Sequence, residues 1–347
     1  MIALLGCPPS ILRATRPILT TPAVWELLGP IIIGPIMSNI PLRSDIFLKF
    51  QLKGRKSICR LLSKVIKWSI KPMKVIYNSR TVEESDLGFF WSNRAYMYGD
   101  SLFDTIFCYQ GQAMRLRYHI DRLKRGMEIL EMDANDLISE KNLQEEIAQL
   151  ILLNRMDGDV RIRLQVVRKA GGYYTPTQKS CDYIMIAIPM KWSFYGIKAN
   201  AGIATSVHTV FQSFSFCKTG SSLMYVKAGL EMKQRALDEI LITDADGNIS
   251  EASSSNVFWV KDNQLFTPSL ETGCIDGVRR RWIIDQMQKS DKPVQQVKAQ
   301  LAELSNADYI FTSNATGINF IGTLDGKEFM TPANSNPPAF LTALLVP

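Results

Sequence analysis

The sequence predicts a mixed α/β (α+β) protein of two lobes, a smaller N-terminal lobe and a larger C-terminal lobe, preceded by an N-terminal extension. Three observations lead to this prediction. Strand-like and helix-like segments alternate after Met73, positive charge is concentrated before it, and a short stretch at 191–196 separates two alternating regions. We therefore expect an extension at 1–72, a small α/β lobe at 73–192 and a larger lobe at 193–347.

Composition favours a globular enzyme over a protein that binds nucleic acid. The chain has 347 residues, of which 46% are hydrophobic, which is enough to bury a substantial core. Its net charge of +7 comes from residues 1–72, where eleven Lys and Arg residues accompany only Glu26 and Asp45. The remaining residues intersperse both signs, so they offer no electrostatic footprint for nucleic acid.

Cysteine and histidine usage argues against metal sites and against two classes of hydrolase. The six cysteines form no C-x-x-C pair and the chain has two histidines, so we expect no zinc site. His119 and His208 are the possible bases of a Ser-His-Asp mechanism, and neither is near a G-x-S-x-G motif. Scattered cysteines suit a reducing cytoplasm, which is the location we expect.

The extension at 1–72 is too broken to cross a membrane, because one acidic residue and two prolines interrupt its longest apolar run. Residues 56–71 place apolar side chains on one helical face and basic ones elsewhere. Such a segment fits an anionic membrane surface or an organellar targeting peptide. The other interpretation is a mis-assigned start, with the protein beginning at Met73.

The small lobe is expected to contain three strands and two helices. Apolar residues recur at helical spacing over 117–132, and a second helix is expected over 140–154. Strand-like runs cover 74–77, 160–168 and 183–189.

The larger lobe is expected to alternate hairpins with helices. Asp244 to Gly247 and Lys261 to Asn263 are turn sequences between strand-like runs, and Gly277 precedes a helical segment. The expected elements are, in order, a strand near 198–206, a helix at 221–236, strands at 240–243 and 248–251, a hairpin turning at 261–263, a helix running to about 289, strands at 309–313 and 317–321, and a short helix at 337–345.

Lys218 and Glu251 are the leading candidates for chemistry. Lys218 stands in a turn of small residues before a helix, and a desolvated lysine can lose its proton and form a Schiff base. Glu251 ends a strand before three serines and an asparagine, and a carboxylate beside a pyridine nitrogen keeps that nitrogen protonated. A solvated surface lysine and a solvated strand end are the alternatives.

Three further segments have the composition of a phosphate site. Gly277 precedes a helix start, Arg122 lies on the helix at 117–132, and residues 312–315 (TSNA) form a polar loop after a strand. Each of these also fits an ordinary helix start, surface arginine or polar loop.

Together these segments resemble the fold type IV enzymes that use pyridoxal 5′-phosphate (PLP): branched-chain aminotransferase, D-amino-acid aminotransferase and 4-amino-4-deoxychorismate lyase. The resemblance covers about residues 73–330. Residues 98–105 (YGDSLFDT) look like the family's YGDGxFET segment, and 119–123 (HIDRL) look like its HxxRL motif. The stretch 218–258 is similar to the block that runs from the Schiff-base lysine to the glutamate of the pyridine nitrogen.

The resemblance implies a role for each matching residue. Lys218 would be catalytic and form the internal aldimine with PLP, Glu251 would pair with the pyridine nitrogen, and Arg122 would hold the phosphate. Further cofactor contacts are implied for the segments that follow, namely Ser254, Ser255, Asn256, Ile275, Gly277, Val278, Arg279, Ser313 and Asn314.

Departures from the family's pattern bear on the reaction. Arg279 stands where aminotransferases usually have a threonine, and residues 221–223 (SSL) replace the Asn-Tyr pair that usually follows the lysine in branched-chain enzymes. The loop 171–175 (GGYYT) looks closer to the lyase, and no Arg-x-His follows Arg168, so the carboxylate site of D-amino-acid aminotransferase is not evident. We expect Arg163 and Arg279 to bind the substrate carboxylate, with Tyr98 also at the substrate.

The leading prediction is an aminotransferase that acts between an amino acid, branched-chain amino acids included, and a 2-oxo acid. The alternative is 4-amino-4-deoxychorismate lyase, which forms 4-aminobenzoate and pyruvate in folate biosynthesis. A third is a non-catalytic PLP-binding or scaffold protein whose basic extension docks on a membrane. The family architecture implies a homodimer in which the partner chain helps close the pocket.

Overall fold

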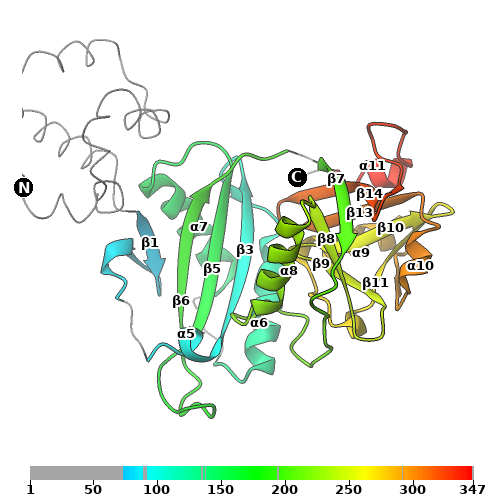
Figure 1. Ribbon diagram of the computed structural model, residues 1–347. Coiled ribbons are helices and arrows are strands. Elements are labelled where there is room, and N and C mark those ends of the chain that lie inside the picture. The colour runs from blue at the N-terminus through cyan, green and yellow to red at the C-terminus, as the bar shows by residue number, and fades with distance from the viewer. Residues whose placement is uncertain are drawn as a thin grey trace, which may run out of the picture. The chain divides into compact units, whose positions relative to one another are not determined.

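The computed structural model describes residues 73–88, 92–133, 136, 138–193, 195–290 and 292–345. The expectations for 1–72, the amphipathic segment at 56–71 included, lie outside the described residues. The described residues belong to one compact unit, Met73–Pro347, which contains two β-sheets (Figure 1).

The first sheet has six antiparallel strands in the order β2-β1-β6-β5-β3-β4. Buried and partly exposed residues alternate along its two central strands, which gives the sheet one apolar face. The strands are β1 (Lys74–Tyr77), β2 (Arg80–Glu83), β3 (Ser101–Tyr109), β4 (Gln112–Ala113), β5 (Val160–Arg168) and β6 (Cys181–Pro189).

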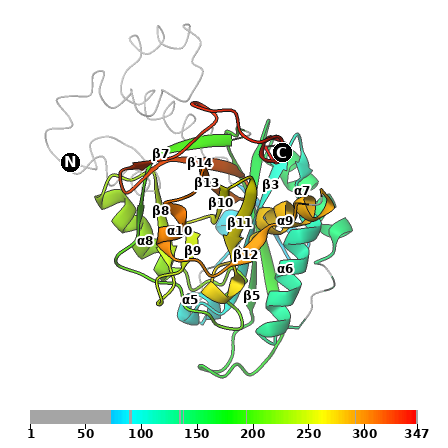
Figure 2. The same ribbon diagram turned by 90° about the vertical axis from the view of Figure 1, so that its right-hand side faces the viewer.

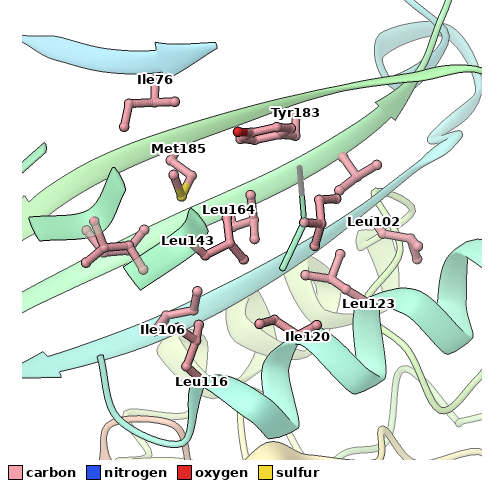
Figure 3. Close-up of a cluster of buried hydrophobic side chains, with 14 of the residues drawn as sticks. Ile76, Leu102, Ile106, Leu116, Ile120, Leu123, Leu143, Leu164, Tyr183 and Met185 are labelled. Atoms are coloured by element: carbon pink, nitrogen blue, oxygen red, sulfur yellow. The ribbon is translucent and has the colours of Figure 1, made fainter. Parts of the chain in front are cut away.

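Two helices, α6 (Leu116–Ile129) and α7 (Glu140–Leu153), cover the apolar face of this sheet. The buried side chains of β3, such as Leu102 and Ile106, meet apolar residues of α6 in one continuous core (Figure 3). Ser139 caps α7, because its hydroxyl accepts a hydrogen bond from the backbone N–H of Asn142 at 3.3 Å. Burial of these apolar side chains holds α6 and α7 against the first sheet.

The second sheet has nine strands and closes on itself, because β9 pairs with β8 on one side and with β10 on the other. Strand β7 runs parallel to both of its neighbours, β14 and β8. Strand β13 runs antiparallel to both of its neighbours, β10 and β14. The strands are β7 (Tyr195–Ile203), β8 (Glu239–Thr243), β9 (Ile249–Ala252), β10 (Asn256–Lys261), β11 (Gln264–Pro268), β12 (Gln295–Val297), β13 (Tyr309–Asn314), β14 (Gly317–Leu324) and β15 (Lys327–Glu328).

Helices pack against the outside of this sheet. α8 (Leu223–Gln234) contacts β8, and α9 (Val278–Lys289) contacts β13. α9 also lies beside α6, so the helices of the two lobes meet (Figure 2). The shorter elements are α5 (Arg94–Tyr98), α10 (Leu301–Leu304), α11 (Ala339–Thr342) and the 3-10 turns η3 (Glu84–Asp86) and η4 (Leu270–Thr272).

The segment that carries Lys218 joins the two lobes. The backbone N–H of Phe103 on β3 donates to the carbonyl of Lys218 at 2.9 Å, and the N–H of Gly220 donates to the carbonyl of Ser101 at 2.8 Å. These bonds continue the first sheet by a short antiparallel bridge between Leu102 and Thr219. Lys218 is therefore held beside β3 by its own backbone.

Most of the elements predicted from the sequence are confirmed. β5 and α9 have the predicted bounds, whereas α6 ends at Ile129 and not at 132, because Glu131 takes a left-handed conformation with φ of 52°. The turn between β8 and β9 is also confirmed, and Gly247 supplies its positive φ of 82°. The sequence analysis missed β3, whose residues were treated as a motif only.

Among the described residues, no helix has the length and apolar character that spanning a membrane requires. The same residues include no group of three or more His, Cys, Asp or Glu side chains able to hold a metal ion.

Candidate active site

A cavity of about 560 Å³ lies where β3, the Lys218 segment, β9 and the start of α9 come together. Lys218, Glu251 and Arg122, which are far apart in the sequence, all line it. The structure also brings nearly all of the other expected cofactor residues to this cavity, namely Ser254, Ser255, Asn256, Ile275, Gly277, Val278, Ser313 and Asn314.

Lys218 lies against an aromatic wall and near a fixed positive charge. Its Nζ is 5.6 Å from the centre of the Phe103 ring. Burial lowers the pKa of Lys218 below its ordinary value, and the guanidinium of Arg122 lowers it further, while the carboxylates of Glu251 and Asp104 oppose these effects. A lysine in this setting is neutral more often than a solvated one, as a nucleophile or base must be.

Glu251 is buried at the end of β9, with 2% of its surface exposed. Its Oε1 accepts a hydrogen bond from the Tyr225 hydroxyl at 2.6 Å, and its Oε2 accepts one from the backbone N–H of Ile275 at 3.2 Å. Burial raises the pKa of Glu251 to about 7, although both hydrogen bonds and the nearby Lys218 favour the charged form. This carboxylate is therefore poised to take or share a proton near neutral pH.

Arg122 is held rigidly on α6 by two partners. Its Nε and Nη2 donate to the carboxylate of Asp104 at 3.2 and 2.6 Å, and its Nη1 donates to the carbonyl of Asp276 at 3.1 Å. The carboxylate of Asp276 in turn accepts from Arg125 at 2.8 Å and from Arg280 at 3.1 Å. The guanidinium of Arg122 is thus fixed at the cavity wall.

The region around Gly277 and Ser313 suits a phosphate group. Gly277 precedes α9 without a side-chain cap, so the positive end of the helix dipole faces this region. A Cβ at Gly277 would overlap Oδ1 of Asn256, so the backbone is bare there. The Oγ of Ser313 is buried and has no hydrogen-bond partner among the described residues.

These observations test whether the site fits PLP. A lysine with a lowered pKa, a buried carboxylate and an arginine beside a helix N-terminus match what the aldehyde, the pyridine nitrogen and the phosphate of PLP require. The buried hydroxyl of Ser313 has no hydrogen-bond partner among the described residues, and it could donate to a phosphate oxygen. The residues present therefore fit the cofactor.

The three residues expected at the substrate do not line the cavity. Arg279 is fully buried and donates from Nε to the carbonyl of Asn314 at 3.1 Å, and burial together with the charge of Arg115 lowers its pKa to about 9. As the second residue of α9, it points its side chain towards Trp282 instead. Its assignment to cofactor and substrate is corrected on this ground.

Tyr98 and Arg163 also lie outside the lining. Tyr98 packs against Tyr174, with ring centres 5.4 Å apart. The guanidinium of Arg163 lies 4.1 Å from the ring centre of Phe103, which does line the cavity. Arg163 therefore contacts a residue that lines the cavity but does not line the cavity itself.

The cavity contains residues that the sequence analysis did not assign. Arg161 lines it, and because Arg161 and Arg163 are two residues apart on β5, they lie on the same face of the sheet. Neither makes an ion pair with the described part of the chain, and burial together with the charge of Arg161 lowers the pKa of Arg163. In the sequence, these two arginines alternate with the apolar residues of the strand, and this pattern could have predicted that both lie on one face of the sheet.

Tyr225 was missed for a different reason. It lies on α8, and its contact with Glu251 depends on how that helix packs on β8 and β9. The sequence around Tyr225 contains no local signal for this contact. Asp104 was quoted in a motif but not given a role.

Comparisons with known proteins agree with this geometry. The family model described as amino-transferase class IV matches residues 101–321. The chain is 27% identical to an aminodeoxychorismate lyase of Bacillus subtilis over 248 residues, 70% of this chain and 83% of the lyase. It is 27% identical to a D-alanine aminotransferase of Bacillus licheniformis over 267 residues, 74% of this chain and 89% of that enzyme.

A solved structure has the same fold. The branched-chain aminotransferase of Thermoproteus uzoniensis, solved with norvaline, superposes with a TM-score of 0.70 at 24% identity. The match covers 79% of this chain and 93% of that one. At this identity the likeness shows the fold alone.

Proposed function

The chain belongs to the class IV aminotransferase family, whose members use PLP, and from this premise we propose that it is a PLP-dependent aminotransferase. The amino group would move between an amino acid and a 2-oxo acid. The observation that carries the proposal is that Lys218, Glu251 and Arg122 line one cavity. PLP, when bound, supplies an electron sink that acidifies the Cα–H of the attached amino acid.

Lys218 is the residue that would hold the cofactor and that would act on the substrate proton. Its lowered pKa leaves its Nζ neutral for part of the time, which suits attack on a carbonyl carbon. The same Nζ would serve as the base for the Cα proton of a bound substrate. Phe103 forms the part of the cavity wall next to this atom, with its ring centre 5.6 Å from Nζ.

Glu251 and Arg122 bind and orient the cofactor. Glu251 would accept a hydrogen bond from the pyridine N–H, and Arg122, the Ser313 hydroxyl and the N-terminus of α9 would hold the phosphate. Arg122 stays in place because Asp104 holds its guanidinium.

Arg161, which lines the cavity, is the proposed site of a substrate carboxylate, and Arg163, kept from the sequence analysis, lies on the same face of β5 behind the cavity residue Phe103. Residues two apart on a strand are separated by about 6.6 Å, which suits one extended anion or two carboxylates. Neither arginine forms an ion pair with an acidic side chain of the described residues, so a ligand carboxylate would meet no competing protein carboxylate there.

A second candidate function is 4-amino-4-deoxychorismate lyase. It is favoured by the similarity to the Bacillus subtilis enzyme, which extends over 83% of that protein. The lyase needs the same lysine and cofactor, so the cavity fits both reactions.

Product analysis distinguishes the two functions. The purified protein, loaded with PLP, is incubated with leucine, glutamate or D-alanine plus a 2-oxo acid, and separately with 4-amino-4-deoxychorismate. A new 2-oxo acid supports the aminotransferase, whereas 4-aminobenzoate with pyruvate supports the lyase. A protein that binds PLP and forms neither product favours the non-catalytic alternative, and one that binds no PLP rejects the proposal.

Two expectations from the sequence remain part of the proposal. A homodimer is expected from the family resemblance, and sedimentation analysis of the purified protein tests it. A cytoplasmic location is expected from cysteine usage, and fractionation of the source cells tests it.

A further inference from the structure

The carboxylate of Glu251 accepts hydrogen bonds from two donors that lie on different segments of the chain. The hydroxyl of Tyr225 on α8 binds Oε1 at 2.6 Å, and the backbone N–H of Ile275, before α9, binds Oε2 at 3.2 Å. A carboxylate oxygen accepts two hydrogen bonds, so each oxygen keeps one site for a ligand in the cavity. The two donors fix the plane in which that site lies.

Several titratable groups of the described residues face Glu251 and interact with its charge. Tyr225 faces it from α8, Lys218 from the segment before α8, and Cys274 from the loop before α9. Burial raises the pKa of Cys274 to about 12, so this thiol is neutral at physiological pH. Burial and the charge of Glu251 raise the pKa of Tyr225, so its hydroxyl keeps its proton and remains a donor.

We infer that Tyr225 is a positioning residue for the cofactor: its hydroxyl favours the ionised form of Glu251 and aims the carboxylate at the pyridine nitrogen. The inference rests on the proposed function, because it needs a pyridine ring beside Glu251. Without the Tyr225 donor the carboxylate becomes more basic and draws the proton from the ring nitrogen. A ring without that proton is a weaker electron sink.

The competing explanation is purely structural. Tyr225 packs against the buried cluster of Ile240 and Ile242, so it also anchors α8 to the sheet. A structural residue, when truncated, lowers stability without changing the proton affinity of Glu251. The test therefore needs a measurement on the protonation of Glu251 itself.

The first measurement uses the protein without cofactor. Glutamate labelled with ¹³C at the carboxyl carbon is incorporated, the variant Glu251→Gln identifies the resonance of Glu251, and its titration is followed by NMR. In Tyr225→Phe we expect the proton affinity of Glu251 to rise about tenfold, as expected when a charge-assisted hydrogen bond is lost. An unchanged titration would overturn the inference.

Tyr183→Phe is the matched control. The hydroxyl of Tyr183 donates to the carboxylate of Glu146 at 2.8 Å, so the same kind of bond is lost in the first sheet, and neither residue lines the cavity. This variant is expected to lower stability and to leave the titration of Glu251 unchanged. A shift of equal size in both variants contradicts a specific role for Tyr225.

The second measurement uses the protein loaded with ¹⁵N-labelled PLP. In Tyr225→Phe the ring nitrogen signal is expected to move towards that of the neutral pyridine, and kcat is expected to fall about tenfold with KM within twofold. If the wild type fails to take up PLP, the proposed function fails. If it takes up PLP and the signal is unchanged in Tyr225→Phe, the inference alone fails.

Should Tyr225→Phe not fold, 3-fluorotyrosine at position 225 keeps the packing and strengthens the donor. The proton affinity of Glu251 must then fall.

Discussion

Asp104 and Arg122 form a two-point ion pair in which Nη2 lies 2.6 Å from Oδ1 and Nε lies 3.2 Å from Oδ2. Both side chains are buried, and His119 adds a third contact to Asp104 at 2.7 Å. Burial alone would raise the pKa of Asp104, but Arg122 and His119 outweigh burial and hold the pKa below its ordinary range. The pair links β3 to α6 at the wall of the cavity.

We expect Asp104→Asn to destabilise the protein by about 3 kcal/mol, because it leaves the buried Arg122 charge uncompensated. PLP affinity should fall as well, since the guanidinium loses its anchor. Urea unfolding without cofactor and PLP titration measure the two effects. Asp121→Asn is the control: this half-exposed carboxylate pairs with Arg281 at 2.5 Å and with Arg125 at 3.3 Å, and because the pairs are partly solvated its loss should cost about 1 kcal/mol.

Lys218→Ala is expected to abolish turnover and the visible absorption band of the lysine-bound cofactor. The reason is that the variant lacks the amine that this cavity holds beside Phe103. Absorption spectra and product assays measure both losses. Lys227→Ala, which changes an exposed lysine of the neighbouring helix, should keep both properties. Full activity in Lys218→Ala would end the catalytic assignment.

The stability of the protein without cofactor should depend on pH through Glu251. Burial raises the pKa of Glu251 from an ordinary 4.5 to about 7, so between these values the folded state binds more protons than the unfolded state. Stability therefore falls as pH rises through this window, by up to about 3 kcal/mol, and the loss is complete above pH 7.

Comparison of wild type with Glu251→Gln isolates this effect. Relative to that variant, the free energy of unfolding of the wild type should drop between pH 5 and pH 8, as measured by urea unfolding. The exposed Glu328→Gln should show no such change. A difference that does not vary with pH argues against a raised pKa.

A chain that begins at Met73 is expected to fold and to bind PLP with wild-type affinity. Among the described residues, those that line the cavity and those that form the two sheets lie after this position. This tests the proposed boundary between an extension at 1–72 and the two lobes. Circular dichroism and PLP titration of the shortened protein are the measurements, and loss of folding would show that residues before Met73 belong to the domain.

The sequence predicted the parts of the site that depend on local patterns. Lys218, Glu251 and Arg122 were proposed because each lies in a motif, and the structure brings all three to one cavity. α9 was predicted from the glycine before it, and it begins directly after that glycine. β3 was missed because its polar motif residues hid the alternation of Leu102 and Ile106, which face the core.

Contacts that depend on tertiary packing were beyond the sequence. Arg279 was placed at the cavity because it stands where aminotransferases usually have a threonine, but each step along a helix turns a side chain by about 100°. The guanidinium of Arg279 lies 5.9 Å from the ring centre of Trp282, and Arg279 does not line the cavity although its neighbour Val278 does. Tyr225 reaches Glu251 across two elements, so no spacing rule identifies the pair.

Ser313→Ala tests the phosphate site with little effect on the fold. The Oγ of Ser313 has no hydrogen-bond partner among the described residues, so its removal should change stability without cofactor by less than about 0.5 kcal/mol. With PLP the hydroxyl would gain a charged acceptor, so affinity should fall about tenfold. Ser335→Ala is the matched control, because Ser335 bonds the Tyr309 hydroxyl at 2.7 Å and does not line the cavity. That variant should lose stability and keep its PLP affinity; the reverse pattern would place the phosphate elsewhere.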